Sequence, residues 1–252
     1  MNINILKTFF CTVIFLVIIN GCTKNGVNGD VSATGIQLLN FYKSDKTYSL
    51  ILGSKDTVIS GIGFNGISKT ASGSPGFYSI SVQDNTNHQL LSGNINLLAG
   101  TQYSLFIVRD SAESADSAQY TLVADNTIQQ LPQYDSCRIR ILDFARNLTY
   151  TDLRFNINEG TGYGLPSPYF QSTFINSRTY LDNNTYPVRS QYFTVPAISY
   201  KVRFLNGSDT TQKILDSTYI TFDKQKKYTF LLLGKYNSQD ANDPFRYQII
   251  SQ

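Results

Sequence analysis

Residues 78–82 read YSISV, a strict alternation of apolar and polar side chains. Because successive side chains of an extended chain point to opposite faces, Tyr78, Ile80 and Val82 share one face and the two serines share the other. The pattern predicts a β-strand with one buried face. It returns at residues 200–204, which read YKVRF and carry Lys and Arg at the outward positions.

Three further pairs of stretches match, in the same order, along the two halves of the chain. They are 36–41 (IQLLNF) with 139–144 (IRILDF), 103–108 (YSLFIV) with 228–233 (YTFLLL), and 120–123 (YTLV) with 247–250 (YQII). Recurrence of strands in one order indicates tandem copies of a domain. Short strands separated by turn residues favour a β-sandwich. We therefore expect an all-β protein with two tandem antiparallel β-sandwiches, immunoglobulin-like or transthyretin-like.

The polar, proline-containing stretch around residue 131 is the expected boundary between the two copies, since such segments commonly separate domains. The expected organisation is a lipoprotein signal peptide at 1–21, a lipidated cysteine with a flexible tether at 22–34, a first repeat at 35–130 and a second repeat at 131–252. After the signal, no stretch holds an apolar pattern long enough for a helix.

The repeat unit resembles the domain of unknown function 4397, which is found in tandem in lipoproteins of Bacteroidota. The resemblance rests on the opening strand at 36–41 and on residues 98–106 (LAGTQYSLF), with the Ala-Gly-x-x-Tyr turn and strand that is the family's most recognisable feature. The second copy reads KQKKYT at 224–229 and departs at the glycine. The resemblance implies the fold and brings no catalytic residues.

The first thirty residues predict export and lipidation. Lys7 precedes an apolar run at 8–19, and Asn-Gly-Cys follows at 20–22. A run shorter than the roughly 20 residues of a membrane span is typical of a cleaved signal. Cleavage before Cys22 would leave an acylated cysteine that anchors the protein to a membrane. We expect an outer-membrane lipoprotein that faces the periplasm or the cell surface; an ordinary secretory signal with an incidental cysteine is the alternative.

Composition excludes several classes of function. Removal of residues 1–21 takes away Lys7 and no acid, which lowers the net charge from +3 to +2, and the basic residues are scattered, so no nucleic-acid partner is expected. Cys137 is the one cysteine left besides Cys22, so no intrachain disulfide is expected. His88 is the single histidine; a Ser-His-Asp triad would have to use it, and a zinc site would need several such ligands. We expect no catalytic residue, no metal and no cofactor.

Five Asp-Ser or Asp-Thr pairs resemble the O-glycosylation sequon of exported proteins in the same phylum. The acceptors would be Thr57, Ser111, Ser117, Thr210 and Ser217. We expect all five in loops, where a transferase reaches them and a glycan disturbs no packing. The alternative is that these pairs are only good turn formers.

A long insertion in the second repeat, between Glu159 and Pro196, contains the loop 160–170, which reads GTGYGLPSPYF. Long loops in compact domains are usually functional or disordered. Its aromatics, Tyr163, Tyr169 and Phe170, are candidate ligand-binding residues that could stack on sugar rings. The alternative is that they cap the open end of their own sandwich.

Two strands are apolar on both faces, at residues 103–108 and 228–233. Such strands need a cover on the outer face, which the sister domain, a partner or a long loop could supply. For the whole chain we expect a non-catalytic cell-envelope lipoprotein with a binding or scaffolding role, which engages a glycan or an envelope protein through sandwich loops. The alternative is a cell-envelope glycan hydrolase with an unrecognised carboxylate site.

Overall fold

The computed structural model describes residues 33–53, 56–109, 118–126, 135–147, 151–157, 172–179, 181–185, 190–206, 214–236 and 243–251. All of them lie in one compact unit, Ala33–Gln252. The expected signal peptide, the expected lipidation site Cys22 and most of the expected tether fall outside the described residues. Within the described part, none of the helices is long and apolar enough to cross a membrane.

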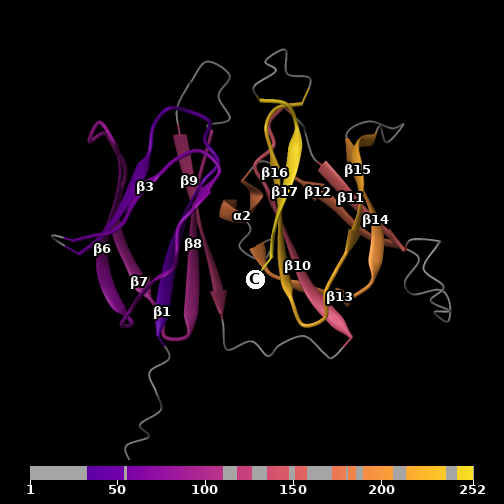
Figure 1. The fold of residues 1–252 in the computed structure, drawn as a ribbon, viewed down its shortest axis with the longest axis horizontal. Helices are drawn as coiled ribbons and strands as arrows, with labels where there is room; N and C mark the ends of the chain where they lie inside the picture. Colours follow the sequence, from indigo (N-terminus) through magenta and orange to yellow (C-terminus); the bar gives the residue numbers. More distant parts are fainter. Residues whose placement is uncertain are drawn as a thin grey trace, which may run out of the picture. The chain divides into compact units, whose positions relative to one another are not determined.

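Strands β1 to β9 form two sheets (Figure 1). Their bounds are β1 Thr34–Asn40, β2 Tyr48–Leu52, β3 Asp56–Ile62, β4 Gly66–Ile67, β5 Ala71–Gly73, β6 Gly76–Asp84, β7 Gln89–Leu97, β8 Thr101–Arg109 and β9 Ala118–Asn126. One sheet has the order β4-β1-β8-β9, with β5 also on β1, and the other has the order β3-β2-β6-β7. Their facing side chains form one buried cluster that includes Leu38, Leu50, Val82 and Leu105. We call these two sheets the first sheet pair.

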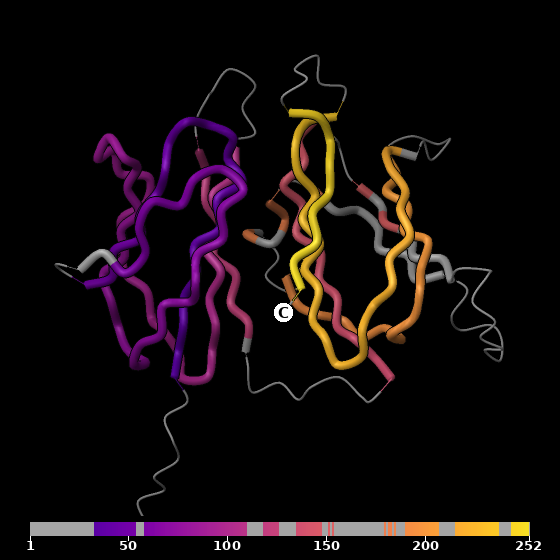
Figure 2. Tube along the Cα trace, viewed as in Figure 1, coloured from indigo at the N-terminus to yellow at the C-terminus, as the bar shows by residue number. Residues whose placement is uncertain are grey.

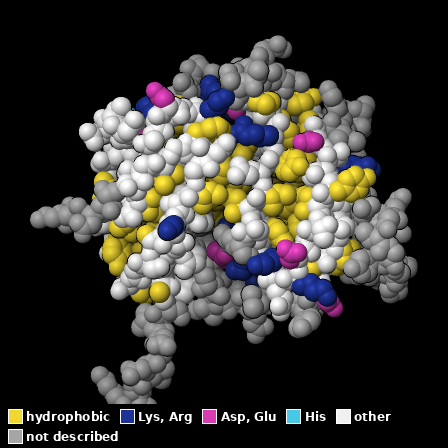
Figure 3. All heavy atoms as spheres, in the orientation of Figure 1, with side chains coloured by type: hydrophobic (Ala, Val, Ile, Leu, Met, Phe, Trp, Pro, Cys, Tyr) yellow, Lys and Arg dark blue, Asp and Glu magenta, His cyan; other side chains and the backbone are white. Residues whose placement is uncertain are grey.

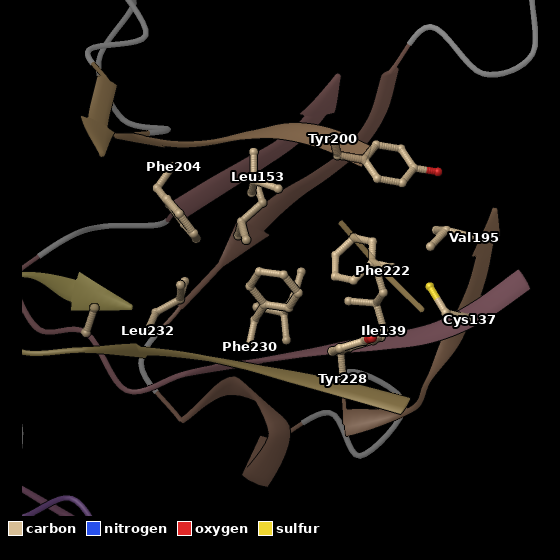
Figure 4. Close-up of a cluster of buried hydrophobic side chains, with 13 residues drawn as sticks. Cys137, Ile139, Leu153, Val195, Tyr200, Phe204, Phe222, Tyr228, Phe230 and Leu232 are labelled. Carbon is tan, nitrogen blue, oxygen red and sulfur yellow. The ribbon is translucent and has the colours of Figure 1, made fainter. Parts of the chain in front are cut away.

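Strands β10 to β17 form the second sheet pair, which a separate, later stretch of the chain builds (Figure 2). Their bounds are β10 Ser136–Asp143, β11 Thr151–Ile157, β12 Ser172–Arg178, β13 Phe193–Pro196, β14 Ser199–Asn206, β15 Ile214–Thr221, β16 Lys227–Leu233 and β17 Arg246–Ser251. The sheet orders are β13-β10-β16-β17 and β12-β11-β14-β15. Between them, side chains from both sheets point toward one another, among them Leu153, Phe204, Phe230 and Leu232 (Figure 4). The all-β sandwich fold expected from the alternating strands is confirmed.

The two sheet pairs have the same strand order when β10 is aligned with β1 and β11 with β2. In each pair, however, the opening strand runs parallel to the strand beside it, with Leu38 opposite Leu105 in β1 and β8, and Ile141 opposite Phe230 in β10 and β16. This differs from the purely antiparallel sheets that we expected. A parallel pair needs a long connection instead of a hairpin, and here most of a sheet pair separates the two strands. The domain boundary near residue 131 lies outside the described residues and stays a prediction.

The matching stretches make matching local contacts. Asn40 and Asp143 end the opening strands, and their Oδ1 atoms accept hydrogen bonds from the backbone N–H groups of Tyr42 at 3.0 Å and Ala145 at 2.8 Å. Both side chains are buried. In both stretches, the asparagine or aspartate that follows the Ile-x-x-Leu residues therefore closes a turn, which is typical of short polar side chains.

The Ala-Gly-x-x-Tyr stretch is a second structural motif. Gly100 has a φ of 66° and Gln225, at the matching position, has a φ of 60°. The tyrosine that follows accepts a hydrogen bond at its hydroxyl from the backbone N–H five residues before it, from Leu98 to Tyr103 at 3.0 Å and from Asp223 to Tyr228 at 2.8 Å. The turn is therefore kept in the second copy although its glycine is not.

The described residues contain one helix, which the sequence analysis did not predict. It is α2, Asp182–Thr185, a single turn of four residues. Four residues are too few to show an apolar period in the sequence, which is why the pattern missed it.

The strands with two apolar faces meet in a third buried cluster. Phe106 and Val108 of β8 lie in it with Leu231 and Leu233 of β16, together with Leu39, Phe41, Val123, Leu142, Phe144 and Leu181. The hypothesis that the two halves of the chain cover each other over these strands is therefore confirmed. The ion pair between Lys227 and Asp125 joins the same two halves at 3.1 Å, with side chains 14% and 10% exposed.

Candidate binding surfaces

The outer face of β6 and β7 is the first candidate surface, and we call it the β6–β7 face. The antiparallel register places Phe77 opposite Asn96, Ser79 opposite Asn94 and Ser81 opposite Ser92. Directly opposed residues of an antiparallel pair share one face of the sheet. The neighbouring residues Ile80 and Val82 point the other way and are buried in the core. The sheet thus presents a row of hydroxyl and amide groups with one aromatic ring.

Two properties distinguish this face from ordinary strand surface. Phe77 is 83% exposed, the largest value among the large apolar side chains described. The side chains of Ser79, Asn94 and Asn96 make no hydrogen bond to another described residue. Amides and hydroxyls both donate and accept, and no charged residue stands at these register positions. The face can therefore pair with a neutral, hydroxyl-rich ligand while Phe77 packs on an apolar patch of it.

The corresponding strands of the second sheet pair present a different surface, the β14–β15 face. Here Lys201 lies opposite Tyr219 and Arg203 lies opposite Ser217. Tyr219 is 62% exposed, and the Lys201 Nζ atom lies 5.4 Å from the centre of its ring, a cation–π contact. Tyr200, Val202 and Phe204, which alternate with the basic residues, are buried in the core. This face combines two cations with an exposed aromatic ring.

Most described carboxylates have structural partners. Asp84 is the clearest case, because its Oδ2 atom lies 2.8 Å from Lys46 Nζ and its Oδ1 atom accepts hydrogen bonds from the backbone N–H groups of Thr86 and His88, both at 2.9 Å. Burial raises the pKa of Asp84, but these hydrogen bonds outweigh burial and hold that pKa well below its ordinary value. His88 therefore lies in a polar hairpin, as expected, and contributes its backbone to the turn.

A polar cluster borders the contact between the two sheet pairs. The Arg140 guanidinium stacks 4.5 Å from the centre of the Tyr192 ring, and its Nε donates to Thr229 Oγ1 at 2.8 Å. Lys227 lies 5.4 Å from the same ring while it pairs with Asp125. Burial raises the pKa of the Tyr192 hydroxyl, although the nearby Arg140 lowers it. The contacts of this cluster therefore hold β9, β10 and β16 together.

Cys137 is a free, buried cysteine in the second core, on the side of the cluster where Val195 lies (Figure 4). Burial raises the pKa of its thiol to about 12, so the thiol is protonated at neutral pH. Across the residues that the structure describes, no three His, Cys, Asp or Glu side chains lie together as a metal site.

Of the candidate lipidation, glycosylation and ligand-binding residues, the structure describes two. Thr57 lies in β3 and Ser217 lies in β15, so the expectation that all five glycosylation candidates lie in loops is wrong for these two. Strand pairing overrides the turn preference of an isolated Asp-Ser or Asp-Thr pair. The others fall outside the described residues: Cys22, Ser111, Ser117, Tyr163, Tyr169, Phe170 and Thr210.

Sequence reasoning noticed the outward serines of β6 and the outward Lys and Arg of β14 but did not treat them as a site. It missed Phe77, Asn94, Asn96 and Tyr219 altogether. The signal was the alternation in the partner strands, where residues 92, 94 and 96 read Ser, Asn and Asn between the apolar core positions. Only the register shows which of these residues lie opposite Phe77 and Ser79.

The fold defines the class first: an all-β protein built of two sheet pairs that share one strand order. Residues 36–154 match the family described as Domain of unknown function (DUF4397). The resemblance expected from residues 36–41 and 98–106 is thereby confirmed. The match spans the first sheet pair and β10 and ends within β11.

The solved structures that this chain resembles have low sequence identities and low TM-scores. A carbohydrate-binding module of family CBM26 from Eubacterium rectale Amy13K, in complex with maltoheptaose, is 11% identical, with 87% of this chain and 97% of that chain covered and a TM-score of 0.25. A proposed cell adhesion protein from Parabacteroides distasonis is 8% identical, with 87% and 97% covered and a TM-score of 0.21. Scores this low support no conclusion about function. No curated protein matches the chain.

Proposed function

We propose that this chain is a non-catalytic binding protein of the cell envelope and that its β6–β7 face contacts neutral carbohydrate. The observation that carries the proposal is Phe77, an 83% exposed ring beside Ser79, Asn94 and Asn96, whose polar side chains have no partner among the described residues. Single exposed apolar residues are common. A sugar matches both features of this face, because its apolar ring face can pack on Phe77 and its hydroxyl groups can hydrogen-bond to the uncharged donors and acceptors.

The energetics favour a ligand with alternating apolar and polar surface. Fully burying a phenylalanine side chain contributes about 1.5–3 kcal/mol. Amide and hydroxyl groups that already face water lose little when a ligand hydroxyl replaces that water, and each net hydrogen bond contributes about 0.5–1.5 kcal/mol. A charged ligand would find no counter-charge at these positions. The expected ligand is therefore a neutral polysaccharide.

The remaining parts of the proposal concern residues outside the described part. An acylated Cys22 and the tether that follows would hold the binding domains at the outer membrane, on its periplasmic or its outer side. Tyr163, Tyr169 and Phe170 would supply a second aromatic contact to glycan or to an envelope protein. The division into tandem repeats at 35–130 and 131–252 is supported by the repeated strand order of the two sheet pairs.

The test is retention of the full-length protein, in detergent, on an array of neutral polysaccharides. Phe77→Ala should weaken binding to the retained polymer by about tenfold, the equivalent of about 1.4 kcal/mol, and Asn94→Ala should weaken it less. Tyr120→Ala is the matched control, because Tyr120 is an exposed aromatic on β9, in the other sheet of the same pair. Unchanged binding of Phe77→Ala, or equal loss in Tyr120→Ala, would contradict the assignment of the face.

A further inference from the structure

The β14–β15 face has features that the proposal above does not use. We propose that it is a second, separate binding site, selective for an anionic polysaccharide, with Lys201 and Arg203 as the charge contacts and Tyr219 as the stacking surface. The proposal stands on the charges of this face and does not depend on neutral-glycan binding by the β6–β7 face.

The cations on β14 have no acid directly opposite them. Among the side chains that the structure describes, Lys201 and Arg203 form no ion pair. The residues opposite them are Tyr219 and Ser217 on β15, and Asn156 and Arg154 on β11. No directly opposed acid therefore competes with an external anion for these two cations.

The fold itself does not require these cations. At the matching positions of the first sheet pair, β6 carries Ser79 and Ser81 while its inward residues Ile80 and Val82 pack in the core. The same strand therefore forms with neutral outward residues. Lys201 and Arg203 are additions to a surface that is already structurally complete.

The chemistry of the face selects the kind of anion. An arginine guanidinium matches a carboxylate or a sulfate with two parallel hydrogen bonds, and a lysine adds a second point charge. Tyr219 is 62% exposed, and its ring lies beside the Lys201 ammonium, 5.4 Å away. A sugar ring that carries an acid group could stack on the tyrosine and direct its carboxylate to the two cations. A simple phosphate or an acidic peptide would leave the exposed ring unused.

The experiment compares polymers and matched variants with the full-length protein in detergent. The probes are polygalacturonate, a neutral polysaccharide retained in the array, and vesicles of phosphatidylglycerol. The double variant Lys201→Ser/Arg203→Ser gives β14 the outward residues of β6. The control Lys224→Ser/Lys226→Ser removes the same charge from a turn, so the two variants have equal net charge.

Polygalacturonate binding should fall at least tenfold in Lys201→Ser/Arg203→Ser, several-fold in Tyr219→Asn, and less than twofold in the control. The parent's binding should weaken as salt is raised from 0.15 M toward 1 M, because salt screens exposed charges. Neutral-polysaccharide binding should be unchanged in Lys201→Ser/Arg203→Ser, and polygalacturonate binding should be unchanged in Phe77→Ala. The two proposed sites can therefore be confirmed or refuted independently of each other.

Three results would overturn the proposal. Equal loss in the control would mean that only net charge matters, and full retention by Lys201→Ser/Arg203→Ser would mean that the face is not the site. Binding to phosphatidylglycerol vesicles without binding to polygalacturonate would assign the face to a membrane surface instead. A gain of polygalacturonate binding on Ser79→Lys/Ser81→Arg would support it, because the same strand scaffold would then carry the transferred charges.

Discussion

The outer faces of β6 and β14 occupy the same place in two sheet pairs of the same strand order. Their outward side chains, however, are neutral on β6 and positively charged on β14. Facing inward, Ile80 corresponds to Val202 and Val82 corresponds to Phe204, and all four are buried. Facing outward, Ser79 and Ser81 correspond to Lys201 and Arg203. The requirement to fill a core acts on one face of the strand only. The other face is free to vary, and there the two halves of the chain differ in their side chains.

The neighbouring strand repeats this division. Asn94 of β7 lies opposite Ser79, and Tyr219 of β15 lies opposite Lys201. The pair of positions therefore differs between the halves, with a hydroxyl and an amide in the first and a cation and an aromatic ring in the second. On the face shown in Figure 3, lysines and arginines are dispersed, and several of them lie beside an acidic side chain. The difference between the two sheet faces is therefore a matter of a few positions, and substitutions there can test it.

The largest expected effect concerns the shared core. Leu50 and Leu153 occupy matching positions, opposite Val82 and Phe204, and both are fully buried. Leu50→Ala and Leu153→Ala should each lower the free energy of unfolding by about 2–5 kcal/mol, because each leaves a cavity. Urea unfolding followed by circular dichroism measures this loss.

The outward positions of the same sheets provide the control. Ser79→Ala and Ser217→Ala should change the free energy of unfolding by less than about 0.5 kcal/mol. Because a buried cluster joins the two sheet pairs, Leu50→Ala and Leu153→Ala should shift one common transition. Two separate transitions, each moved by one variant alone, would show that the sheet pairs unfold independently.

The next effect concerns the contact between the halves. Asp125 belongs to the first sheet pair and Lys227 to the second, and their ion pair is shielded from solvent. Asp125→Asn and Lys227→Met should each lower the free energy of unfolding by about 1.5–3 kcal/mol, the contribution of a hydrogen bond between charged groups. In a double-mutant cycle the two losses should be less than additive by 0.5 kcal/mol or more. Strict additivity would mean that the pair contributes nothing to the contact.

These contacts mark what the sequence could predict. The alternation at residues 78–82 and 200–204 gave the strands and their buried faces, because a period of two is a local property. The apolar outer faces of residues 103–108 and 228–233 gave the contact between the halves, because such a surface needs a cover. The family motif gave the turn, because a turn is decided by a few neighbouring residues.

What the sequence did not show depends on distant partners. The parallel pairing of β1 with β8 joins residues such as Leu38 and Leu105, which no local pattern relates. The β6–β7 face requires the register that puts Phe77 opposite Asn96. Ser217 looked like a loop residue because Asp-Ser prefers turns, but β14 supplies a pairing partner for that segment. Each of these features depends on tertiary context that overrides local preference.

A smaller effect concerns the turn in which the two copies differ. Gly100 and Gln225 both have positive φ, 66° and 60°, a region that costs a residue with a Cβ about 1–2 kcal/mol. Gly100→Ala should therefore lower the free energy of unfolding by about 1 kcal/mol, and Gln225→Gly should raise it by up to about 1 kcal/mol. Gln102→Ala, two residues further along the first copy, serves as a control at ordinary φ. Destabilisation by Gln225→Gly would show that the glutamine side chain, and not the backbone, determines this turn.

The smallest expected effect is a loss of stability at acid pH. It comes from one carboxylate, which the first half has and the second half lacks. Asp84 ends β6, and Asn206 ends β14 at the matching position. The hydrogen bonds from Lys46, Thr86 and His88 hold the pKa of Asp84 below its unfolded value, which is about 3.9. The unfolded chain therefore binds more protons than the folded chain in this range, so the stability due to Asp84 is present above pH 4 and is lost as the pH falls further.

Asp84→Asn makes the two positions alike and removes the titrating group. The parent should be more stable than the variant at pH 7, and this difference should shrink below pH 4, by no more than about 1.4 kcal/mol per pH unit. The urea midpoint of both proteins at pH 7, 4 and 3 measures it. Asp216→Asn is the control, because Asp216 lies on a strand of the other sheet pair and its side chain accepts a hydrogen bond from the backbone N–H of its neighbour Ser217. If the difference between the parent and Asp84→Asn is the same at all three pH values, the hairpin is held by the shape of the side chain and not by its charge. The acid sensitivity of the first half would then have to arise elsewhere, and the single-carboxylate difference between the halves would be without consequence for stability.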